Sequence, residues 1–285
     1  MKRIGIVAKT DREEARTTVA RLLEWCLGRG LEPLCEKETA ALCPQMSVAA
    51  VRRPDLPSQV DVLVVLGGDG TLLSMARLVG DLGVPILGVN LGGLGFLTAL
   101  TVDELIPALE AHLAGGLCIE ERMMLSATVS RQGERLSEYV ALNDMVITKS
   151  AMSRIIRLEV AVDGEFATGY RADGLIVSTP TGSTAYCLSA GGPIVFPTMD
   201  AMVLTPICSH TLTNRPIVLP GSQRIEVTLL TDQDVMLTAD GQVGFALKQM
   251  DRVEVRRATP RLRLLRFPHR HFFSVLRTKL KWGER

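Results

Sequence analysis

An acidic residue lies among three glycines in the segment Gly67-Gly68-Asp69-Gly70-Thr71. Glycines let the backbone approach a ligand closely, and N–H groups at the start of a helix can bind a phosphate. A carboxylate would repel a bare phosphate, so we expect Asp69 to face a hydroxyl group or a metal ion. An acid beside a phosphate-binding turn indicates phosphoryl transfer to an alcohol. The alternative is a tight turn that uses Asp and Gly only for their backbone preferences.

A second polar feature is the segment from Arg171 to Pro193, in which an apolar strand predicted at 175–177 opens into a hydroxyl-rich run. The hydroxyl side chains are Ser178, Thr179, Thr181, Ser183, Thr184, Tyr186 and Ser189. Such a run can line a polar pocket and form hydrogen bonds to sugar or phosphate oxygens. The alternative is an irregular, well-hydrated loop.

The third polar feature is Leu142-Asn143-Asp144, which lies between apolar strand segments. Adjacent Asn and Asp residues inside a strand are costly unless their polar groups are satisfied. They therefore mark either a bulge or a contact with a ligand.

The elements that must position Asp69 follow from the apolar pattern. An unbroken apolar run at 62–66 predicts a strand buried on both faces, and helical spacing from Leu72 to Val79 predicts a helix directly after the glycines. Strands are also predicted at 3–8 and 84–89, the latter leading into a second glycine-rich loop at 90–96. Two such loops at strand ends are typical of the ligand-binding edge of a doubly wound sheet.

Two further helices are expected in this first part of the chain. One begins at Asp11, with Glu14 at the reciprocal position of a capping box, and ends at Gly28 or Gly30. The other is capped by Thr101 or Asp103 and runs to about residue 114. The proline-containing stretch 36–60 is expected to be connecting structure.

After Gly116 the pattern changes to alternation typical of strands. The predicted strands are 123–130, 139–148, 155–162, 224–230, 235–238, 253–257 and 262–266, with a final helix at 274–282. Turn signals at Gln132-Gly133, Asp163-Gly164 and Asp240-Gly241 separate them. We therefore expect an α/β domain at 1–115, an all-β sandwich at 116–266, and a helical tail at 267–285 that packs back on the first domain.

Composition limits the class of protein. A chain of 285 residues exceeds the usual size of one core, and the formal net charge of +1 argues against a nucleic-acid-binding protein. The segment 252–285 is locally basic, with eleven Lys or Arg and two Glu. We interpret it as solvated strand and helix faces, with attraction of a polyanionic substrate as the alternative.

The six cysteines contain no CxxC pair and no histidine partners at metal spacing, which indicates reduced thiols in a cytoplasmic protein. Two uncharged stretches, 82–102 and 174–199, are long enough to cross a bilayer. Both have the Gly, Pro, Ser and Thr content of loops, so no membrane association is expected.

Four blocks of this sequence resemble the bacterial NAD kinases. They are LGGDGTLL (66–73), NLGGLGFLT (90–98), LND (142–144) and DGLIVSTPTGSTAYCLSAGGP (173–193), in the order in which that family has them. GGDGT alone is shared with diacylglycerol and sphingosine kinases and, loosely, with phosphofructokinases. The fourth block is much more specific to NAD kinases.

The resemblance implies an N-terminal Rossmann-like α/β domain and a C-terminal β-sandwich domain that together bind NAD, with ATP as phosphoryl donor. Asp69 would be the general base for the 2′-hydroxyl of the adenosine ribose, and the phosphate loop would comprise Gly67, Gly68, Gly70 and Thr71. The remaining residues that would contact NAD, besides Asp69 and Gly70, are Asn143, Asp144, Arg154, Arg171, Asp173, Thr184, Ala185, Tyr186, Ser189 and Gln242. Many relatives have Glu at the position of Asp144, so this chain has one methylene less of reach there. The position of Arg154 varies among relatives.

The resemblance also implies a homodimer or homotetramer formed through the β domain. Since the chain has no dense carboxylate cluster, Mg²⁺ is expected to arrive with ATP, held by its phosphates, with Asp69 as a further candidate ligand. A lipid kinase built on the same GGDGT turn and a non-catalytic nucleotide-binding module are the alternatives. The sequence leaves open the choice between ATP and polyphosphate, the use of NADH, feedback by the reduced dinucleotides, and dimer versus tetramer.

Overall fold

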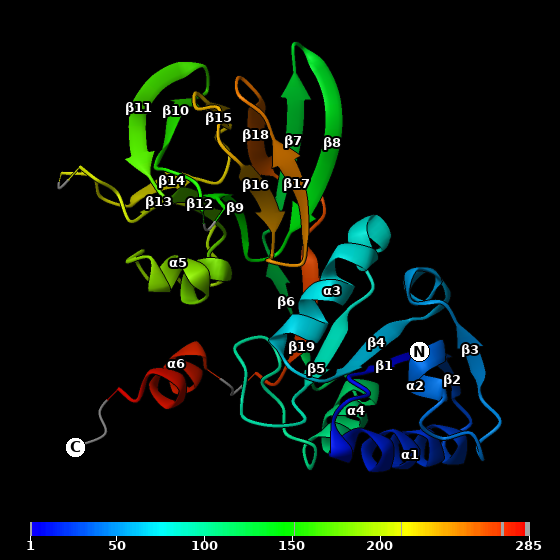
Figure 1. The fold of residues 1–285 in the computed structure, drawn as a ribbon. Helices are drawn as coiled ribbons and strands as arrows, with labels where there is room; N and C mark the ends of the chain where they lie inside the picture. Colours follow the sequence, from blue (N-terminus) through cyan, green and yellow to red (C-terminus); the bar gives the residue numbers. More distant parts are fainter. Residues whose placement is uncertain (1, 151, 212, 269–270, 283–285) are drawn as a thin grey trace. The chain divides into compact units, whose positions relative to one another are not determined.

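A computed structural model describes residues 2–150, 152–211, 213–268 and 271–282 of the chain (Figure 1). The chain divides into two compact units, Met1–Glu121 with Leu262–Arg285 and Arg122–Arg261. The first unit combines helices with a mainly parallel sheet, and the second is built mainly from antiparallel strands, which confirms the predicted fold class. Among the described residues, none of the helices has both the length and the apolar character that crossing a membrane needs.

The first unit is organised around one sheet. In the part of the chain that the structure describes, its strand order is β3 (Ala49–Val51), β2 (Glu32–Glu36), β1 (Arg3–Ala8), β4 (Val62–Leu66), β5 (Ile86–Val89), β19 (Leu262–Arg266) and β6 (Cys118–Arg122). Every pairing from β3 through to β19 is parallel. The order reverses between β1 and β4, and a doubly wound sheet binds its ligand at the carboxyl ends of the strands at such a reversal.

Helices cover both faces of this sheet. The helices of this unit among the described residues are α1 (Glu13–Gly28), α2 (Lys37–Ala40), α3 (Asp69–Val79), α4 (Leu105–Leu113) and α6 (Phe272–Leu280), with short 3₁₀ helices η1 (Arg53–Asp55), η2 (Pro57–Gln59) and η3 (Gly80–Leu82). Of these, α1, α3 and α4 lie against the sheet (Figure 1). Apolar residues of α1 and α4 share one buried cluster with alternate residues of β1 and β4, whereas α3 lies on the opposite face (Figure 1). This arrangement explains why β4 is apolar at every position, since both of its faces are buried.

Both predicted helix caps in the first unit are wrong. Helix α1 begins at Glu13 with Arg12 at the N-cap, and no side chain caps it. Helix α4 begins at Leu105, and the carboxylate of Glu104 accepts hydrogen bonds from the backbone N–H and the hydroxyl of Thr101. Tertiary packing therefore set where these helices start, because a missing cap costs only about 1 kcal/mol.

The predicted domain boundary also differs from the structure. Strand β19, predicted as part of the β-sandwich, and strand β6, which lies in the range 116–266 predicted for that domain, both belong to the sheet of the first unit. The chain therefore leaves the first unit after β6 and returns to it with β19, which adds to β5 as a parallel strand. The predicted tail at 267–285 contains α6 and belongs to the first unit, although residues 269–270 and 283–285 lie outside the described part. Its packing on the first domain stays a prediction.

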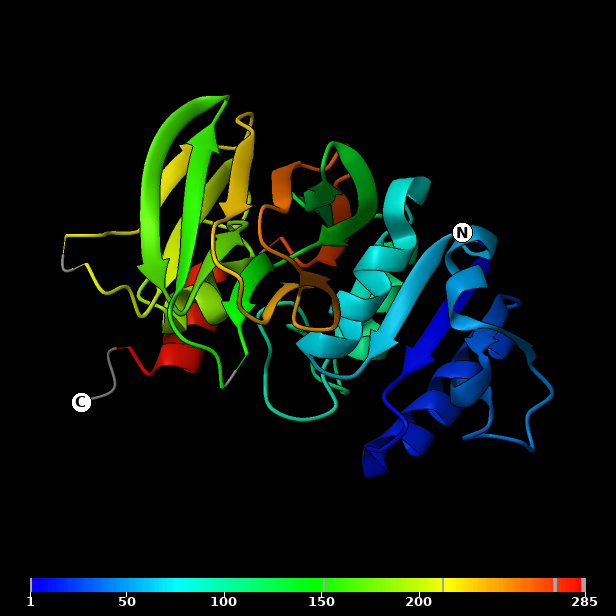
Figure 2. The ribbon, with the colours of Figure 1, turned by 45° about the horizontal axis from the view of Figure 1, so that its top comes forward.

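The second unit contains two antiparallel sheets in the part that the structure describes. One has the order β11 (Glu165–Ala172), β10 (Ile156–Val162), β15 (Ile225–Leu229), β18 (Arg252–Arg257), β7 (Leu125–Arg131) and β8 (Glu134–Ala141). The other has the order β14 (Ile217–Pro220), β13 (Ala201–Ile207), β12 (Gly174–Ser178), β9 (Asp144–Lys149), β16 (Val235–Ala239) and β17 (Val243–Leu247). Between β12 and β13 lie η4 (Gly182–Thr184) and α5 (Tyr186–Ser189). The long hairpin of β10 and β11 is plain in Figures 1 and 2.

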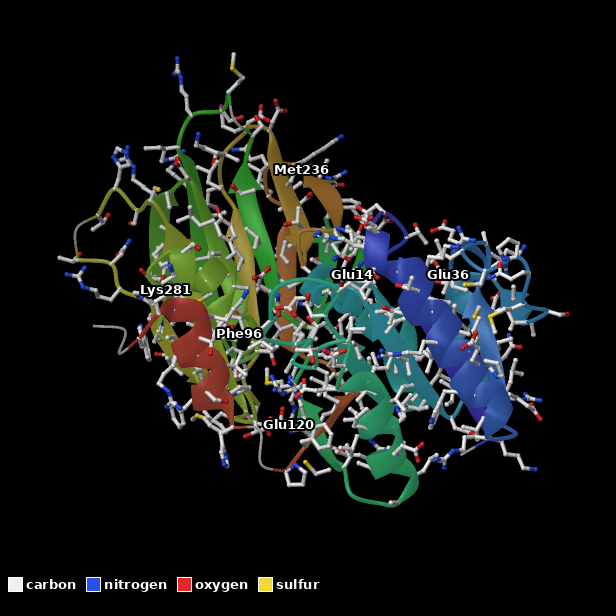
Figure 3. The ribbon with its side chains drawn as sticks, turned by 90° about the horizontal axis from the view of Figure 1, so that it is seen from below. Glu14, Glu36, Phe96, Glu120, Met236 and Lys281 are labelled. Atoms are coloured by element: carbon white, nitrogen blue, oxygen red, sulfur yellow. The ribbon has the colours of Figure 1, made fainter. Side chains whose placement is uncertain are left out.

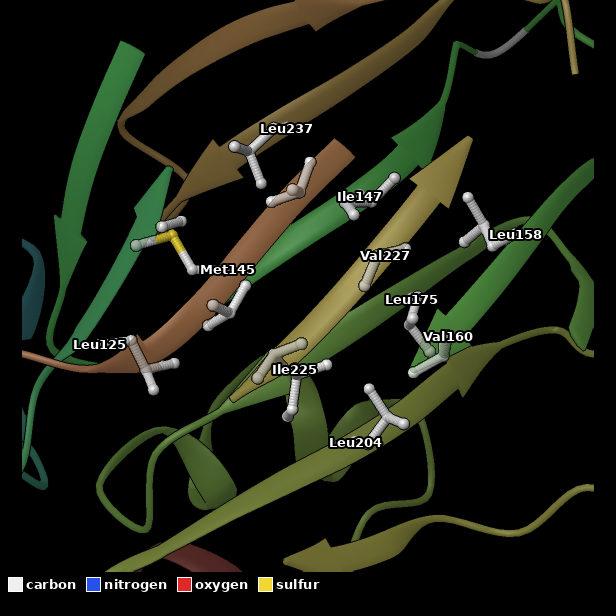
Figure 4. Close-up of a cluster of buried hydrophobic side chains, with 14 of the residues drawn as sticks. Leu125, Met145, Ile147, Leu158, Val160, Leu175, Leu204, Ile225, Val227 and Leu237 are labelled. Carbon is white, nitrogen blue, oxygen red and sulfur yellow. The ribbon is translucent and has the colours of Figure 1, made fainter. Parts of the chain in front are cut away.

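One apolar core joins the two sheets into the predicted sandwich. Its side chains come from both sheets, for example Leu158 and Val227 from the first and Ile147, Leu175 and Leu237 from the second (Figure 4). They are at most 3% exposed, and full burial of such a side chain contributes about 1.5–3 kcal/mol. The alternation of apolar and polar residues along β10 follows from this burial on one face.

The segment predicted as one strand from Tyr139 to Thr148 is two strands in two sheets. Strand β8 ends at Ala141, β9 begins at Asp144, and Leu142-Asn143 forms the corner between the sheets. The three predicted hairpin turns are confirmed. Each has positive φ at both central residues, as at Asp240 (φ 52) and Gly241 (φ 62).

Candidate active site

The turn from β4 into α3 is fixed by close contacts of its glycines and by a backbone hydrogen bond to β5. The backbone N–H of Gly67 donates to the carbonyl of Val89 at 2.9 Å. A Cβ atom on Gly67 would lie 2.6 Å from the hydroxyl oxygen of Thr71, so only glycine fits there. A Cβ atom on Gly68 would have no atom within 4 Å, so there is open space beside the first turn of α3. The turn therefore combines close backbone contacts with open space at the start of α3, which a nucleotide-binding loop would need.

Asp69 is the first residue of α3, and its carboxylate is held by the second glycine-rich loop. The Oδ1 atom accepts hydrogen bonds from the N–H of Leu97 (3.0 Å), the N–H of Thr98 (2.9 Å) and the hydroxyl of Thr98 (2.9 Å). The Oδ2 atom accepts one, from the N–H of Phe96 at 2.9 Å. Since a carboxylate oxygen has room for about two acceptor contacts, Oδ1 is saturated and Oδ2 keeps acceptor capacity.

The loop after β5 is built so that its donors converge on this carboxylate (Phe96 is labelled in Figure 3). Asn90 fixes the loop, because its amide donates to the Thr98 hydroxyl at 2.8 Å and its carbonyl oxygen accepts from the N–H of Gly92 at 2.8 Å. A Cβ atom on Gly95 would lie 2.2 Å from Asp69 Oδ1. Gly95 must therefore stay glycine for the carboxylate to keep its position.

In the second unit, the Asn143-Asp144 pair lies at a rigid corner. The Asp240 carboxylate accepts hydrogen bonds from the N–H groups of Leu142, Asn143 and Asp144 at 3.1, 2.7 and 3.3 Å. From the other side, Thr179 donates its N–H to the Asn143 carbonyl (2.8 Å) and its hydroxyl to the Leu142 carbonyl (2.6 Å). Because the backbone polar groups at this corner have hydrogen-bond partners, burying Asn143 and Asp144 here does not carry the energetic cost of unsatisfied backbone groups.

The carboxyl group of Asp144 has an unusual environment. Asp144 is 4% exposed, and burial, followed by the negative charge of Asp240, raises its pKa to about 7. The group therefore exists in both protonated and ionised forms at neutral pH. A strongly shifted carboxyl beside polar groups is characteristic of a functional site.

The hydroxyl-rich segment divides into structural and accessible groups. The hydroxyls of Ser178 and Thr179 donate to backbone carbonyls, and that of Ser183 donates to Pro180 O and accepts from the N–H of Val195. These buried hydroxyls fix the loop, which corrects the expectation that the whole run lines a pocket. The predicted contacts Thr184, Ala185, Tyr186 and Ser189 are all partly or fully exposed.

The predicted arginines line one groove. Arg154 and Arg171, with Ile155 and Arg157, border a cavity of about 670 Å³. Arg157 lies directly opposite Arg171 in the register of β10 and β11. Among the described residues, no acidic side chain pairs with these three arginines. Like charges in directly opposite positions are unfavourable, so the groove is suited to an anion.

The predicted NAD contacts of the second unit thus form two groups. Strands β9 and β12 pair from Asp144 opposite Ser178 at one end to Thr148 opposite Gly174 at the other. The first group lies at the Ser178 end and comprises Asn143, Asp144, Gln242 and the segment 184–189. The second group lies at the Gly174 end and comprises Arg154, Arg171 and Asp173. Lys149 links the latter group, since its ammonium lies 2.9 Å from Ser153 O and 3.7 Å from Asp173 Oδ1. The two groups are separated by four residues along β12, from Gly174 to Ser178, a distance of roughly 13 Å.

The residues that support the site carry little signal in the sequence. Asp240 was identified only as a turn former, Arg157 only as a strand residue, and the N–H donors of 96–98 not at all. Backbone donors carry no side-chain signal, and the partners of Asp240 lie more than 90 residues away. No cluster of three or more His, Cys, Asp or Glu that could hold a metal occurs within the described ranges.

Comparisons with known proteins agree along the whole chain. Residues 4–117 match the model of the ATP-NAD kinase N-terminal domain, and residues 142–267 match that of the ATP-NAD kinase C-terminal domain. The chain is 52% identical over 286 residues to the NAD kinase of Geotalea daltonii and 53% identical over 287 residues to that of Geobacter sulfurreducens, covering 100% of both chains in each case.

Two solved structures share the fold. The yeast NADH kinase complexed with NADH superposes with a TM-score of 0.93 at 24% identity, over 100% of this chain and 89% of that one. The NAD kinase from Archaeoglobus fulgidus in complex with ATP gives a TM-score of 0.77 at 25% identity, over 98% of each chain.

Proposed function

The chain belongs to the NAD kinase family, and on that premise we propose that it transfers the terminal phosphoryl group of ATP to the 2′-hydroxyl of the adenosine ribose of NAD, which yields NADP. The observation that carries the proposal is the Asp69 carboxylate, fixed by four hydrogen bonds at the start of a helix that follows a glycine turn. Phosphoryl transfer needs a positioned hydroxyl and stabilisation of phosphate charge, with little covalent work from the protein.

Asp69 acts as the general base, and Oδ2 is the atom that takes the proton. Three donors occupy Oδ1, while Oδ2 accepts one N–H and retains a lone pair for the ribose hydroxyl. Gly67, Gly68, Gly70 and Thr71 form the phosphate loop. The N–H groups and positive end of α3 would face the phosphates of the donor.

The second unit supplies the dinucleotide contacts. Asn143, Asp144, Gln242 and the segment 184–189 offer hydrogen-bonding groups for the ribose and the base. Arg154 and Arg171 supply positive charge for the phosphates, and Arg157, directly opposite Arg171, adds to it. A phosphate in this groove would offset the repulsion between the guanidinium groups. We expect Arg157→Met to raise the KM for NAD about tenfold, and an unchanged KM would remove Arg157 from the site.

In this mechanism Mg²⁺ would enter the site bound to the phosphates of ATP. The described residues lack the carboxylate cluster of a dedicated metal site, and Mg²⁺ commonly binds through substrate phosphates with few protein ligands. When bound, the ion neutralises charge on the transferred phosphoryl group. Polyphosphate could meet the same requirements, so donor preference is a separate measurement.

The protein is proposed to be a cytoplasmic homodimer or homotetramer. All six cysteines are free, as is typical of a reducing compartment. The edge strands β14 and β17 of one sheet carry exposed apolar residues, Ile217 and Val218 on β14 and Val243 on β17. Such edges favour pairing with a second chain. A monomer mass by light scattering at micromolar protein concentration would refute the assembly.

The test of function is a direct assay of the product. Protein, NAD, ATP and Mg²⁺ are mixed, and NADP is identified by mass spectrometry. The same preparation is offered diacylglycerol or sphingosine in mixed micelles. We expect NADP and no phosphorylated lipid; the reverse result would assign the chain to the lipid kinases. Binding of NAD without turnover would support a nucleotide-binding module.

A further inference from the structure

The turn between β16 and β17 carries a carboxylate whose partners lie far away in the sequence. Asp240 has φ of 52° and Gly241 of 62°, which is the conformation of a two-residue hairpin. A turn former has no need to place its side chain on another segment. The Asp240 carboxylate nevertheless accepts from three consecutive N–H groups, those of residues 142–144.

Three consecutive N–H groups that converge on one anion form a concave site in the backbone. Here that site is filled from within the protein, and the Asp240 N–H in turn donates to the Asp144 carbonyl at 3.0 Å. Thr179 and Ser178 hold the remaining carbonyls of the corner. Each backbone polar group of residues 142–144 therefore has a partner. The directions of the Asn143 and Asp144 side chains follow from this fixed backbone.

We propose that Asp240 is a positioning residue for the Asn143-Asp144 pair, which it orients through the backbone and polarises through its charge. The inference rests on the proposed function, in which that pair binds NAD. Asp240 itself needs no contact with the dinucleotide.

The charge effect is distinguishable from the geometric one. Three groups surround Asp144: Ser178, its partner on the neighbouring strand β12, Cys187 of α5, and Asp240 in the turn between β16 and β17. Burial raises the pKa of the Cys187 thiol, so it stays neutral at pH 7, and Ser178 carries no charge. Burial is the main cause of the raised pKa of Asp144, and Asp240 is the charged neighbour that raises this pKa further.

Two substitutions separate the two effects. Asp240→Asn removes the charge and keeps the size and the turn preference; its carbonyl oxygen can replace Oδ1 as acceptor for the N–H groups of Asn143 and Asp144, while the contact with Leu142 is lost. Asp240→Glu keeps the charge but displaces the carboxylate. NAD affinity is measured by calorimetry from pH ~5.5 to ~8.5, a range that brackets the titration of Asp144. The matched control is Asp163→Asn. Asp163 also precedes glycine in a hairpin, with φ of 51°, but its carboxylate accepts a hydrogen bond from the N–H of Arg224 and not from residues 142–144.

We expect Asp240→Asn to move the midpoint of the pH dependence of NAD binding down by about one unit, because a repelling charge is lost. Asp240→Glu should weaken NAD binding about tenfold at a nearly unchanged midpoint. Asp163→Asn should change neither quantity. Loss of affinity at all pH values without movement of the midpoint in Asp240→Asn would reduce Asp240 to a structural role and overturn the proposal.

Folding and function failures remain separable. If Asp240→Asn does not fold, the NAD affinity of Asp240→Glu tests the proposal instead. An NAD affinity equal to that of the wild type in this variant overturns the proposal. If Asn143→Ala and Asp144→Asn bind NAD as the wild type does, the pair does not bind NAD and the proposed site is wrong. If those two variants lose affinity while both Asp240 variants keep it, the inference about Asp240 alone fails.

Discussion

Asp69→Asn tests the residue on which the mechanism depends. Asparagine has nearly the same size, and its carbonyl oxygen can take the place of Oδ1 with the three donors from Leu97 and Thr98. The amide nitrogen then takes the place of Oδ2 and faces the N–H of Phe96, which donated a hydrogen bond at 2.9 Å. One of four hydrogen bonds is lost, and two donors face each other.

The structure gives separate magnitudes for stability and catalysis. A donor left without its acceptor costs about 1–3 kcal/mol, so we expect the melting temperature to fall by a few degrees. Loss of the general base should lower kcat by ~10²–10⁴-fold, because a ribose hydroxyl is a weak acid. NAD affinity should change less than about tenfold, since its main contacts lie in the second unit.

The assay compares kcat at saturating NAD and ATP, NAD affinity and the melting temperature on one preparation. Thr98→Val is the matched control, since it removes the hydroxyl that donates to Asp69 Oδ1 and accepts from Asn90. It should cost a similar ~1–3 kcal/mol in stability but leave kcat within about tenfold. Near-normal turnover in folded Asp69→Asn, or an equal loss of kcat in Thr98→Val, would refute base catalysis by Asp69.

The remaining predictions concern pH, packing and metal. The pKa of Asp144 is raised to about 7 in the folded protein, so protonation favours folding below that pH and stability falls as pH rises from about 4 to 7. Asp144→Asn should lose this dependence and gain up to about 4 kcal/mol relative to the wild type above pH 7, as thermal melting across pH will show. Gly95→Ala should lower kcat at least about 100-fold, because its Cβ would meet Asp69 Oδ1 at 2.2 Å, whereas Gly93→Ala, with no atom within 4 Å, should remain active. Activity should disappear in excess EDTA and return with Mg²⁺; full turnover in EDTA would contradict a metal-assisted mechanism.

Local sequence determined the conformations that depend on neighbouring residues. The apolar run at 62–66, the glycines that follow it and the helical spacing after them were enough to predict a strand, a turn and a helix around Asp69. Asp-Gly and Gln-Gly pairs likewise predicted hairpins, because only a few residue types tolerate positive φ at both central positions. The nucleotide-binding character of the first unit therefore followed from residues that are adjacent in the chain.

Tertiary structure alone decided which distant groups meet. The donors for Asp69 come from 27 to 29 residues away, and those for Asp240 from 96 to 98 residues away. Strand β19 joins the first sheet only after the chain has built the whole second unit. Such pairings depend on strand register and on closure of long loops, and backbone N–H groups have no residue type that a sequence can show. For the same reason the raised pKa of Asp144 could not be predicted, since it arises from burial at a corner between two sheets and from the charge of a turn residue.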